Sequence, residues 1–446
     1  MKYSPEELLG LSPKEKRAIL ARMLKERSSA KNLMALANAD SFAVTTDQLE
    51  QYAVLDPAIQ AAGKPHAPAG PPHSIFLTGS TGFLGAFLLD ELLARTQATI
   101  YCLVRADSEQ AGLRRVIDNL VGHGLSDHAH EQSRIVPVLG DLAKPKLGMA
   151  PQQYAALAEQ VQIVYHNGAY VNWIFPYERL ADTNVQGAQE VLRFACERVV
   201  KPVHHISTLS IFPILDDTAT SITESHSLDH GGQLYGGYTQ TKWVSEKLMA
   251  MARERGLPVC VYRPGMITGH SASGVGNVDD FMSKWLKSWV ELGYGPELDM
   301  TVDMTPADYV CQGMVHLSLL PERTSDVFHL VNRQPLTARE LIDWMIGAGY
   351  LVGSMPYEAW RTKLLAGSGQ SLESASYALL PLFMLKRAES SFGIAAFDDT
   401  QAVNHLAGSD IRCAPLDAEL LDTYFAYFVR QGFMPRPREQ AMSRGV

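Results

Sequence analysis

Short runs of apolar residues alternate with helical patterns between Ser74 and Gly269. Each run is apolar throughout, which is typical of strands in a parallel sheet with helices on both faces. The alternation predicts βαβ units, and several runs at regular spacing favour a sheet over short buried helices. The predicted strands contain Ile75–Leu77, Ile100–Val104, Ile135–Leu139, Ile163–Tyr165 and Val259–Tyr262.

The flanking parts of the chain have different patterns. A helical pattern near the N-terminus is followed by a looser stretch, which ends in the Pro/Gly-rich residues 63–72 and is typical of a linker. After Ser271 the pattern is mainly helical, with one strand-like run at Val327–Val331.

These patterns predict an α/β fold: a Rossmann-type doubly wound parallel sheet with a smaller, mainly helical C-terminal substrate domain. The predicted divisions are an N-terminal helical segment and linker (1–70), a dinucleotide-binding domain (71–270) and the C-terminal domain (271–446), of which 300–335 return partly to the sheet.

Composition narrows the class of protein. A chain of 446 residues with 46% hydrophobic content can bury a large core. No apolar run is long enough for a membrane span, and Met1–Gly10 lacks the apolar core of a signal peptide, so we expect a soluble cytoplasmic protein.

The five cysteines form no CxxC pair, so we expect free thiols and no metal. The net charge of −9 argues against a nucleic-acid partner.

Three glycines, Gly79, Gly82 and Gly85, form GxxGxxG directly after the first apolar run and before a helical pattern. A strand, glycine turn and helix in this order bind the pyrophosphate of a dinucleotide at the helix N-terminus. The whole turn is therefore predicted to contact the cofactor. Its members are Gly79, Ser80, Thr81, Gly82, Phe83, Leu84 and Gly85.

The second apolar run ends at Arg105, where NAD-binding proteins carry an acidic residue that binds the ribose. A guanidinium suits the 2′-phosphate of NADP(H) instead. Arg114 or Arg115 is a candidate second contact. The alternatives are a solvated surface arginine, and Asp107 as a ribose acceptor two residues later.

The ends of the next two runs add candidate cofactor contacts. Asp141 and Leu142 follow the third run, where the carboxylate suits the adenine amino group or a helix cap. Asn167 and Ala169 follow the fourth run, where small residues let a cofactor approach the backbone. His166 at the same place is predicted to be structural.

A tyrosine and a lysine, Tyr238 and Lys242, are four residues apart and share one face of a helix. An ammonium beside a phenol favours the phenolate and lowers its pKa, which lets the tyrosine exchange a proton. Both residues are also predicted to bind the cofactor, and the lysine can hold the nicotinamide ribose. The hydroxyls of Ser207, Thr208 and Ser210 follow the apolar Ile206, and one of them is expected to bind the reacting oxygen.

A further strand is followed by Arg263–Gly269. Its proline restricts the backbone and its glycine permits close approach, so Pro264, Gly265 and Ile267 are predicted to form a wall for the nicotinamide. An ordinary loop after a strand is the alternative.

Together these motifs resemble the extended short-chain dehydrogenase/reductase superfamily. Within it, Ser74–Leu89 and Cys102–Ala106 resemble thioester reductase domains, which end nonribosomal peptide synthetases, polyketide synthases and carboxylic acid reductases. Ile267–Phe281 is the more specific match, since ordinary sugar epimerases lack it. The tail, including Trp360 and Gly432–Pro435, resembles the family's helical domain.

The resemblance assigns the catalytic hydroxyl, tyrosine and lysine to Thr208, Tyr238 and Lys242, because the family's hydroxyl lies four residues before an aromatic, here Phe212. It assigns the phosphate-binding arginines to Arg105 and Arg115. It implies NADPH-dependent release of an acyl or peptidyl thioester as an aldehyde, with further reduction to the alcohol left open.

The implied partner is an acyl or peptidyl carrier protein bearing a phosphopantetheine thioester, or else coenzyme A. Residues 1–73 contain no carrier-like serine motif, so we expect the carrier on a separate chain or in a longer protein. Residues 1–31 hold eight basic and four acidic side chains with an apolar stripe, which suits either docking to an acidic carrier or packing on the domain itself. We expect a monomer.

Three other functions share parts of this pattern. A nucleotide-sugar epimerase or dehydratase has the glycines and YxxxK but normally prefers NAD. A fatty acyl-coenzyme A reductase performs the same chemistry. A non-catalytic NADP-binding sensor is the third, although such proteins tend to lose the tyrosine or the lysine that this chain retains.

Overall fold

The computed structural model describes residues 43–125, 131–173, 175–212, 221–320, 326–367, 375, 379 and 396–437. The predicted docking segment, residues 1–31, lies outside these ranges. The strands are β1 (Ala43–Thr45), β2 (Ser74–Thr78), β3 (Thr99–Val104), β4 (Ile135–Leu139), β5 (Ile163–His166), β6 (Val203–Ile206), β7 (Gln233–Tyr235), β8 (Val259–Pro264), β9 (Tyr294–Glu297), β10 (Thr301–Val302), β11 (Val327–Leu330), β12 (Leu336–Thr337) and β13 (Gly353–Pro356).

The helices alternate with these strands along most of the chain. They are α5 (Thr46–Leu49), α6 (Phe83–Arg95), α7 (Glu109–Gly122), α8 (Pro151–Gln160), α9 (Tyr177–Ala181), α10 (Gly187–Cys196), α11 (Gly237–Glu254), α12 (Phe281–Leu292), α13 (Ala307–Ser318), α14 (Ala338–Gly347), α15 (Tyr357–Gly367), α17 (Thr400–Leu406) and α18 (Ala418–Arg430). Short 3-10 or π turns are η1 (Glu50–Tyr52), η2 (Gln132–Arg134), η3 (Pro145–Gly148), η4 (Asp182–Gln186) and η5 (Leu209–Ile211).

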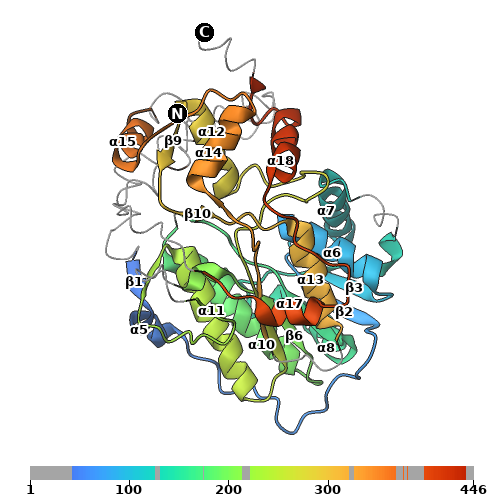
Figure 1. Cartoon of the computed structure of the whole chain (residues 1–446). Helices are drawn as coiled ribbons and strands as arrows, with labels where there is room; N and C mark the ends of the chain where they lie inside the picture. Colours follow the sequence, from blue (N-terminus) through green and yellow to red (C-terminus); the bar gives the residue numbers. More distant parts are fainter. Residues whose placement is uncertain are drawn as a thin grey trace, which may run out of the picture.

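Seven parallel strands form the central sheet, in the order β11-β8-β6-β5-β2-β3-β4 (Figure 1). The first strand of this sheet along the chain, β2, lies between β3 and β5, and its Thr78 pairs with Leu103 on one side and His166 on the other. The strand order therefore reverses between β2 and β5. In open α/β sheets such a switch point marks the crevice in which ligands bind. The predicted Rossmann-type fold is confirmed.

Strand β6 is absent from the five predicted runs because it contains two histidines, His204 and His205. Both are buried. His204 Nδ1 lies 2.9 Å from the hydroxyl of Tyr262 on β8, so a hydrogen bond inside the sheet satisfies the ring. A strand that buries polar side chains escapes a search for apolar runs.

Two buried clusters cover the two faces of the sheet. Helices α8, α10 and α11 supply one cluster, and α6, α7, α13 and α17 supply the other. Because both faces are covered, most of the strand side chains are buried, and every residue of the central strand β2 is buried. Among the described residues, no helix combines the length and the apolar character that a membrane crossing requires.

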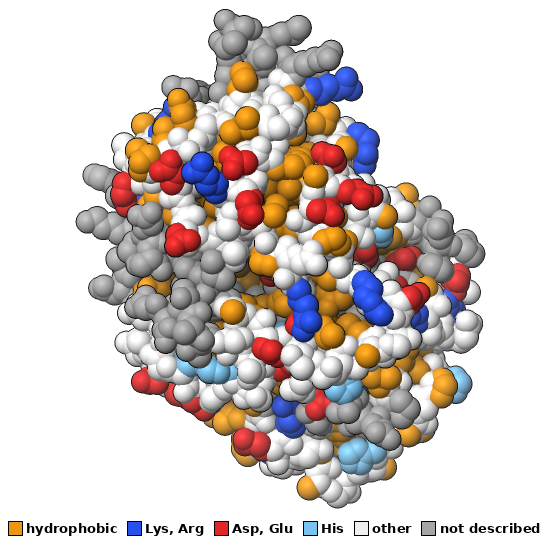
Figure 2. All heavy atoms as spheres, viewed as in Figure 1, with side chains coloured by type: hydrophobic (Ala, Val, Ile, Leu, Met, Phe, Trp, Pro, Cys, Tyr) orange, Lys and Arg blue, Asp and Glu red, His pale blue; other side chains and the backbone are white. Residues whose placement is uncertain are grey.

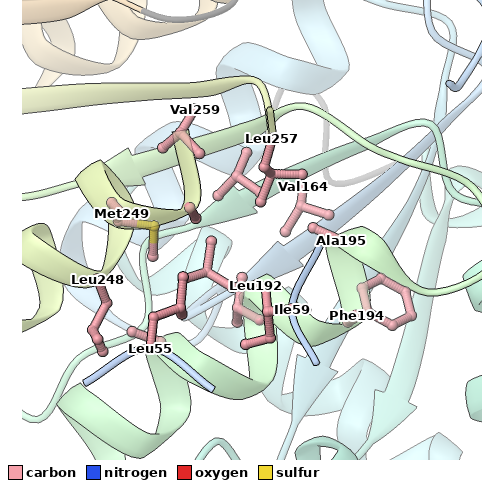
Figure 3. Packing of buried hydrophobic residues seen from close by; sticks show 14 of the residues in the cluster. Leu55, Ile59, Val164, Leu192, Phe194, Ala195, Leu248, Met249, Leu257 and Val259 are labelled. Atoms are coloured by element: carbon pink, nitrogen blue, oxygen red, sulfur yellow. The ribbon is translucent and has the colours of Figure 1, made fainter. Parts of the chain in front are cut away.

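The chain before β2 packs on the sheet domain. Strand β1 pairs antiparallel with β7. Leu55 and Ile59 insert between α10 and α11 (Figure 3) and are 2% and 1% exposed. Arg255 donates hydrogen bonds to the carbonyls of Leu55, Asp56 and Ile59. The segment predicted as loose is thus fixed by core contacts with residues far away in the sequence.

The C-terminal helices form a second layer above the sheet domain (Figure 1). A third apolar cluster joins α12, α14, α15 and α18 and includes the buried Trp285, Trp289 and Trp360. The chain also returns to the sheet through α13 and β11, which pairs with β8. The mainly helical character predicted for this region is confirmed, and the boundaries between domains stay a prediction.

Candidate active site

A cleft of about 1050 Å³ opens at the carboxyl ends of the sheet strands and extends to α12. Figure 2 shows hydrophobic side chains gathered across the middle of this face, between the C-terminal helices and the sheet domain. The cleft brings together predicted site residues that are far apart in the sequence. Those that line it are Gly79, Thr81, Gly82, Phe83, Leu84, Gly85, Arg105, Arg115, Asp141, Leu142, Asn167, Ala169, Thr208, Tyr238, Lys242, Pro264, Gly265 and Ile267. Ser80 does not line it, because its side chain is fully buried.

The glycine turn is held by two close backbone contacts. Gly79 has φ +77°, and a Cβ there would lie 2.7 Å from the backbone of Gly168. A Cβ on Gly85 would lie 1.9 Å from the carbonyl oxygen of Gly79. Both positions therefore require glycine. Helix α6 begins at Phe83 without a side-chain cap, so its first amide groups are left for an anion in the cleft.

Asn119 on α7 supports this turn from behind. Its side-chain amide donates to the carbonyls of Ser80 and Gly82, at 3.0 Å each. This residue was not predicted from the sequence, since an asparagine inside a helix has no local signal for a contact with a turn almost 40 residues earlier.

The two arginines assigned to phosphate binding lie together. Both line the cleft, and Arg115 donates to the main-chain carbonyl of Arg105. Arg114 and Asp107, the alternatives considered from the sequence, do not line it. The pair therefore places two exposed positive charges beside the end of β3.

The residues at the ends of β4 and β5 make structural hydrogen bonds, and some of them also line the cleft. The Asp141 carboxylate accepts from the amide of Ala143 at 3.1 Å, so it caps a turn while lining the cleft. Asn167 donates to the Gly79 carbonyl at 3.3 Å. His166 Nδ1 lies 3.0 Å from the Thr78 hydroxyl, and burial lowers the pKa of this histidine to about 3. Its buried, neutral ring is structural in this arrangement.

Helix α11 brings Tyr238 and Lys242 to the cleft, one turn apart. The Lys242 ammonium is buried, donates to the Ile206 carbonyl and lies 3.4 Å from His205 Nε2. Burial lowers the pKa of Lys242 to about 8, while the Glu246 carboxylate acts in the opposite direction.

The pKa of Tyr238 differs from the expectation. The sequence pattern predicts that the ammonium lowers it, but burial raises the pKa of Tyr238 to about 12. The ammonium is engaged by acceptors on β6, so desolvation of the phenolate dominates. A raised pKa keeps the hydroxyl protonated, which suits a proton donor.

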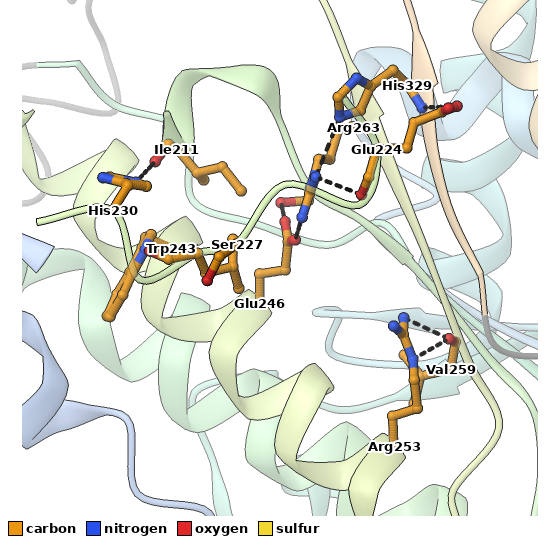
Figure 4. A network of polar contacts seen from close by, with 12 residues as sticks. Ile211, Glu224, Ser227, His230, Trp243, Glu246, Arg253, Val259, Arg263 and His329 are labelled. Carbon is orange, nitrogen blue, oxygen red and sulfur yellow. Dashed lines mark hydrogen bonds and ion pairs between the residues drawn. The ribbon is translucent and has the colours of Figure 1, made fainter. Parts of the chain in front are cut away.

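The three candidate hydroxyls have different partners. Ser207 donates to the Glu246 carboxylate. Glu246 also forms a buried ion pair with Arg263, at 2.6 Å (Figure 4). Thr208 lies at the N-terminus of η5, accepts from the Ser210 amide and donates to the Ser210 hydroxyl, both at 3.2 Å. All three residues line the cleft. The Ser207 hydroxyl is committed to the buried Glu246 carboxylate, whereas the hydroxyls of Thr208 and Ser210 belong to a local turn on the cleft wall.

The backbone after β8 forms one wall of the cleft, through Pro264, Gly265 and Ile267. The Met266 amide donates to the Asp303 carboxylate at 3.1 Å, and the Thr305 hydroxyl donates to the same group at 2.8 Å. Asp303 was not predicted from the sequence, because its contact with residue 266 is long-range.

Aromatic side chains continue the cleft beyond Tyr238. The ring of Trp173 meets that of Tyr238 edge-on, with centroids 5.2 Å apart. Phe281 and Trp285 extend the row toward α12. These aromatics were also missed as site residues, although Phe281 ends the segment that carries the family resemblance.

Comparison with known proteins decides the family. The model of the male sterility protein family matches residues 77–314. The crystal structure of the terminal R domain from the myxalamid PKS-NRPS biosynthetic pathway is 40% identical, with a TM-score of 0.83, and the alignment covers 88% of this chain and 99% of that one. The chain belongs to the thioester reductase domains of the extended short-chain dehydrogenase/reductase superfamily.

Curated proteins contain similar reductase domains. Isonitrile lipopeptide synthase of Streptomyces coeruleorubidus is 35% identical over 390 residues, which are 86% of this chain and 26% of that protein. L-2-aminoadipate reductase of Schizosaccharomyces pombe is 34% identical over 387 residues, 82% of this chain and 27% of that protein. The chain thus spans less than a third of the length of these relatives.

Membership in this family makes the reductase domain an oxidoreductase with a nicotinamide-binding fold. A UDP-glucuronic acid 4-epimerase from Bacillus cereus, solved with NAD, is 15% identical with a TM-score of 0.55, and the alignment covers 81% of this chain and 99% of that one. That likeness concerns the fold alone.

Proposed function

We propose that this reductase domain uses NADPH to reduce an acyl or peptidyl thioester to an aldehyde and a free thiol. The supporting observation is that Thr208, Tyr238 and Lys242 line one cleft together with the glycine turn and the arginine pair. The thioester is expected on the phosphopantetheine of a carrier protein or on coenzyme A. A thiolation-reductase di-domain is among the solved structures with this fold.

The residues present fit NADP(H). Gly79 and Gly85 bring the backbone close to the cleft, and the uncapped start of α6 offers amides to a pyrophosphate. Arg105 and Arg115 supply the positive charge that a 2′-phosphate requires. The bound cofactor supplies a hydride to the thioester carbon.

The chain's own side chains act on the thioester oxygen. As negative charge develops there, the hydroxyls of Thr208 and Tyr238 donate hydrogen bonds to it. Tyr238 then transfers its proton to the oxygen, and the positive charge of Lys242, one helical turn along α11, stabilises the phenolate that remains. The resulting hemithioacetal loses its thiol and becomes the aldehyde. The products are one aldehyde, one thiol and oxidised cofactor for each hydride and proton consumed.

Purified protein tests this function directly. It is mixed with NADPH and an acyl-pantetheine thioester. The loss of NADPH absorbance is followed while the aldehyde is trapped as a hydrazone. We expect stoichiometric NADPH oxidation, thiol release and aldehyde. Product analysis by mass spectrometry distinguishes an aldehyde from an alcohol formed by a second hydride transfer. NADPH binding without turnover of any thioester would favour a non-catalytic sensor.

A further inference from the structure

The cleft has two chemically different halves. The sheet order separates them, since Arg105 follows β3 while the Asp303 carboxylate contacts the backbone after β8, several strands away. The charged side chains that line the described cleft are Arg105, Arg115, Asp141, Lys242, Asp280 and Asp303. The three cations lie on the side assigned to the cofactor: Arg105 directly after β3, Arg115 on α7 and Lys242 on α11.

The other half is aromatic and apolar. From Tyr238 the ring centroids run 5.2 Å to Trp173, 6.1 Å on to Phe281 and 5.9 Å on to Trp285. The loop after β5 and the start of α12 therefore form one continuous row of rings that begins at the reacting hydroxyl. Further apolar side chains of the wall are Met266, Met282, Met300, Val302 and Phe397.

Two carboxylates line this half of the cleft: Asp280 directly precedes Phe281 of the aromatic row, and Asp303 lies against the backbone of Gly265 and Met266. Asp280 caps α12 by accepting from the Ser283 amide at 2.6 Å. Asp303 accepts from the Met266 amide and the Thr305 hydroxyl. These hydrogen bonds fix both carboxylates in place. Burial raises the pKa of each to about 6, so both remain ionised above neutral pH.

The geometry points to the acyl group that this cleft accepts. Resting on the proposed reductase function, we infer that the substrate is a thioester with an extended apolar or aromatic acyl group, and that acyl groups with a terminal carboxylate are rejected. The aromatic row binds methylene or aryl groups by excluding water from them. An anionic end would approach Asp280 and Asp303 without a cation to pair with, and it would lose its hydration there.

A matched pair of substrates tests the inference. Octanoyl-pantetheine and the pantetheine monothioester of octanedioic acid have the same chain length and differ in the terminal carboxylate. We expect kcat/KM to be about 100-fold higher for octanoyl, the scale at which an unpaired polar group disfavours a substrate in such a site. We also expect butanoyl-pantetheine to be reduced at least about 10-fold less efficiently than octanoyl, because fewer methylenes reach the aromatic row.

Variants of the cleft test which residues carry the discrimination between the octanoyl and octanedioyl substrates. Asp280→Asn retains a good helix-capping residue, and Asp303→Asn retains a carbonyl acceptor. Either substitution should raise kcat/KM for the octanedioyl substrate about 5- to 10-fold relative to octanoyl, because it removes one like charge. Phe281→Ala should lower kcat/KM for octanoyl about 10-fold while changing butanoyl less. NADPH affinity and thermal unfolding are measured for each variant to establish that it is folded.

The outcomes separate the two proposals. Equal kcat/KM for the octanoyl and octanedioyl substrates would overturn the inference and leave the reductase function standing. Absence of turnover with every thioester would overturn the function and the inference with it. A preference for octanoyl that persists unchanged in both aspartate variants would overturn the role of the carboxylates.

Discussion

Ser207 donates its hydroxyl hydrogen to the buried Glu246 carboxylate, so the hydroxyl of the residue directly before the proposed catalytic threonine is already engaged. The same carboxylate accepts from Arg263 Nε at 2.9 Å and Nη2 at 2.6 Å. Because α11 carries both Glu246 and Lys242, this buried network ties the end of β6 to the helix that presents the proposed catalytic pair. It leaves Thr208 and Ser210 as the cleft hydroxyls for the substrate, and the family resemblance selects Thr208.

Thr208→Val should lower kcat about 100-fold or more, because it removes a donor to the developing oxyanion while keeping the side-chain shape. Ser207→Ala is the matched control. It should lower the free energy of unfolding by about 1–3 kcal/mol, since Glu246 loses a donor, with a smaller loss of kcat. Steady-state kinetics and thermal unfolding of both variants check this. A larger kcat loss in Ser207→Ala than in Thr208→Val would reverse the assignment.

Tyr238→Phe should reduce the rate of thioester reduction about 100-fold or more, the usual scale for general acid catalysis. NADPH affinity, measured by fluorescence, should change little. Tyr52→Phe provides the control, because Tyr52 is 44% exposed and outside the cleft lining. Near-normal turnover by Tyr238→Phe would remove the tyrosine from the mechanism.

The pH dependence should follow Lys242. Burial lowers its pKa to about 8, so the ammonium loses its proton, and kcat/KM should fall, as the pH rises through about 8. The Glu246 carboxylate raises that pKa, and Glu246→Gln should therefore move the falling limb to lower pH. The measurement is kcat/KM of the unmodified protein and of Glu246→Gln from about pH 6 to about pH 10, a range that brackets the pKa of Lys242. A limb at the same pH in both would assign it to another group.

Cofactor preference should depend on the arginine pair. Hydrogen bonds to charged groups contribute about 1.5–3 kcal/mol each, so Arg105→Ala should weaken NADPH binding about 10- to 100-fold and NADH binding little. Arg115→Ala should act in the same direction. Arg114→Ala is the control, since this neighbour does not line the cleft. Equal losses for NADPH and NADH would indicate that the arginines do not contact a 2′-phosphate.

The segment before β2 should contribute to stability. Ile59 is 1% exposed, and Ile59→Ala should lower the free energy of unfolding by about 2–5 kcal/mol because a cavity forms in a packed core. Val54 is 62% exposed, and Val54→Ala should change the free energy of unfolding by less than about 0.5 kcal/mol. Chemical denaturation of both variants gives the comparison. Equal stabilities would mean that residues 54–59 are not part of the core.

Features that depend on neighbours in the chain were predictable. The GxxGxxG turn, the apolar strands and the spacing of Tyr238 and Lys242 follow from backbone sterics and helical periodicity. Arg105 was found in the same way, because it directly follows a strand. The resemblance to thioester reductases then brought Thr208 and Arg115 into the predicted site.

Features that depend on distant contacts were decided by the tertiary structure. The sequence by itself determined that a dinucleotide-binding α/β domain carries a Tyr-Lys pair. Four features depend on the tertiary structure. They are the hydrogen bond between Ser207 and Glu246, the pKa of Tyr238 raised by burial, the contact of Asn119 with the glycine turn, and the packing of Ile59 between two helices. The aromatic row from Trp173 to Trp285 was decided there too, since it is assembled from a loop and a helix more than 100 residues apart. Local patterns record backbone preferences, whereas burial and partner choice depend on which segments meet in space.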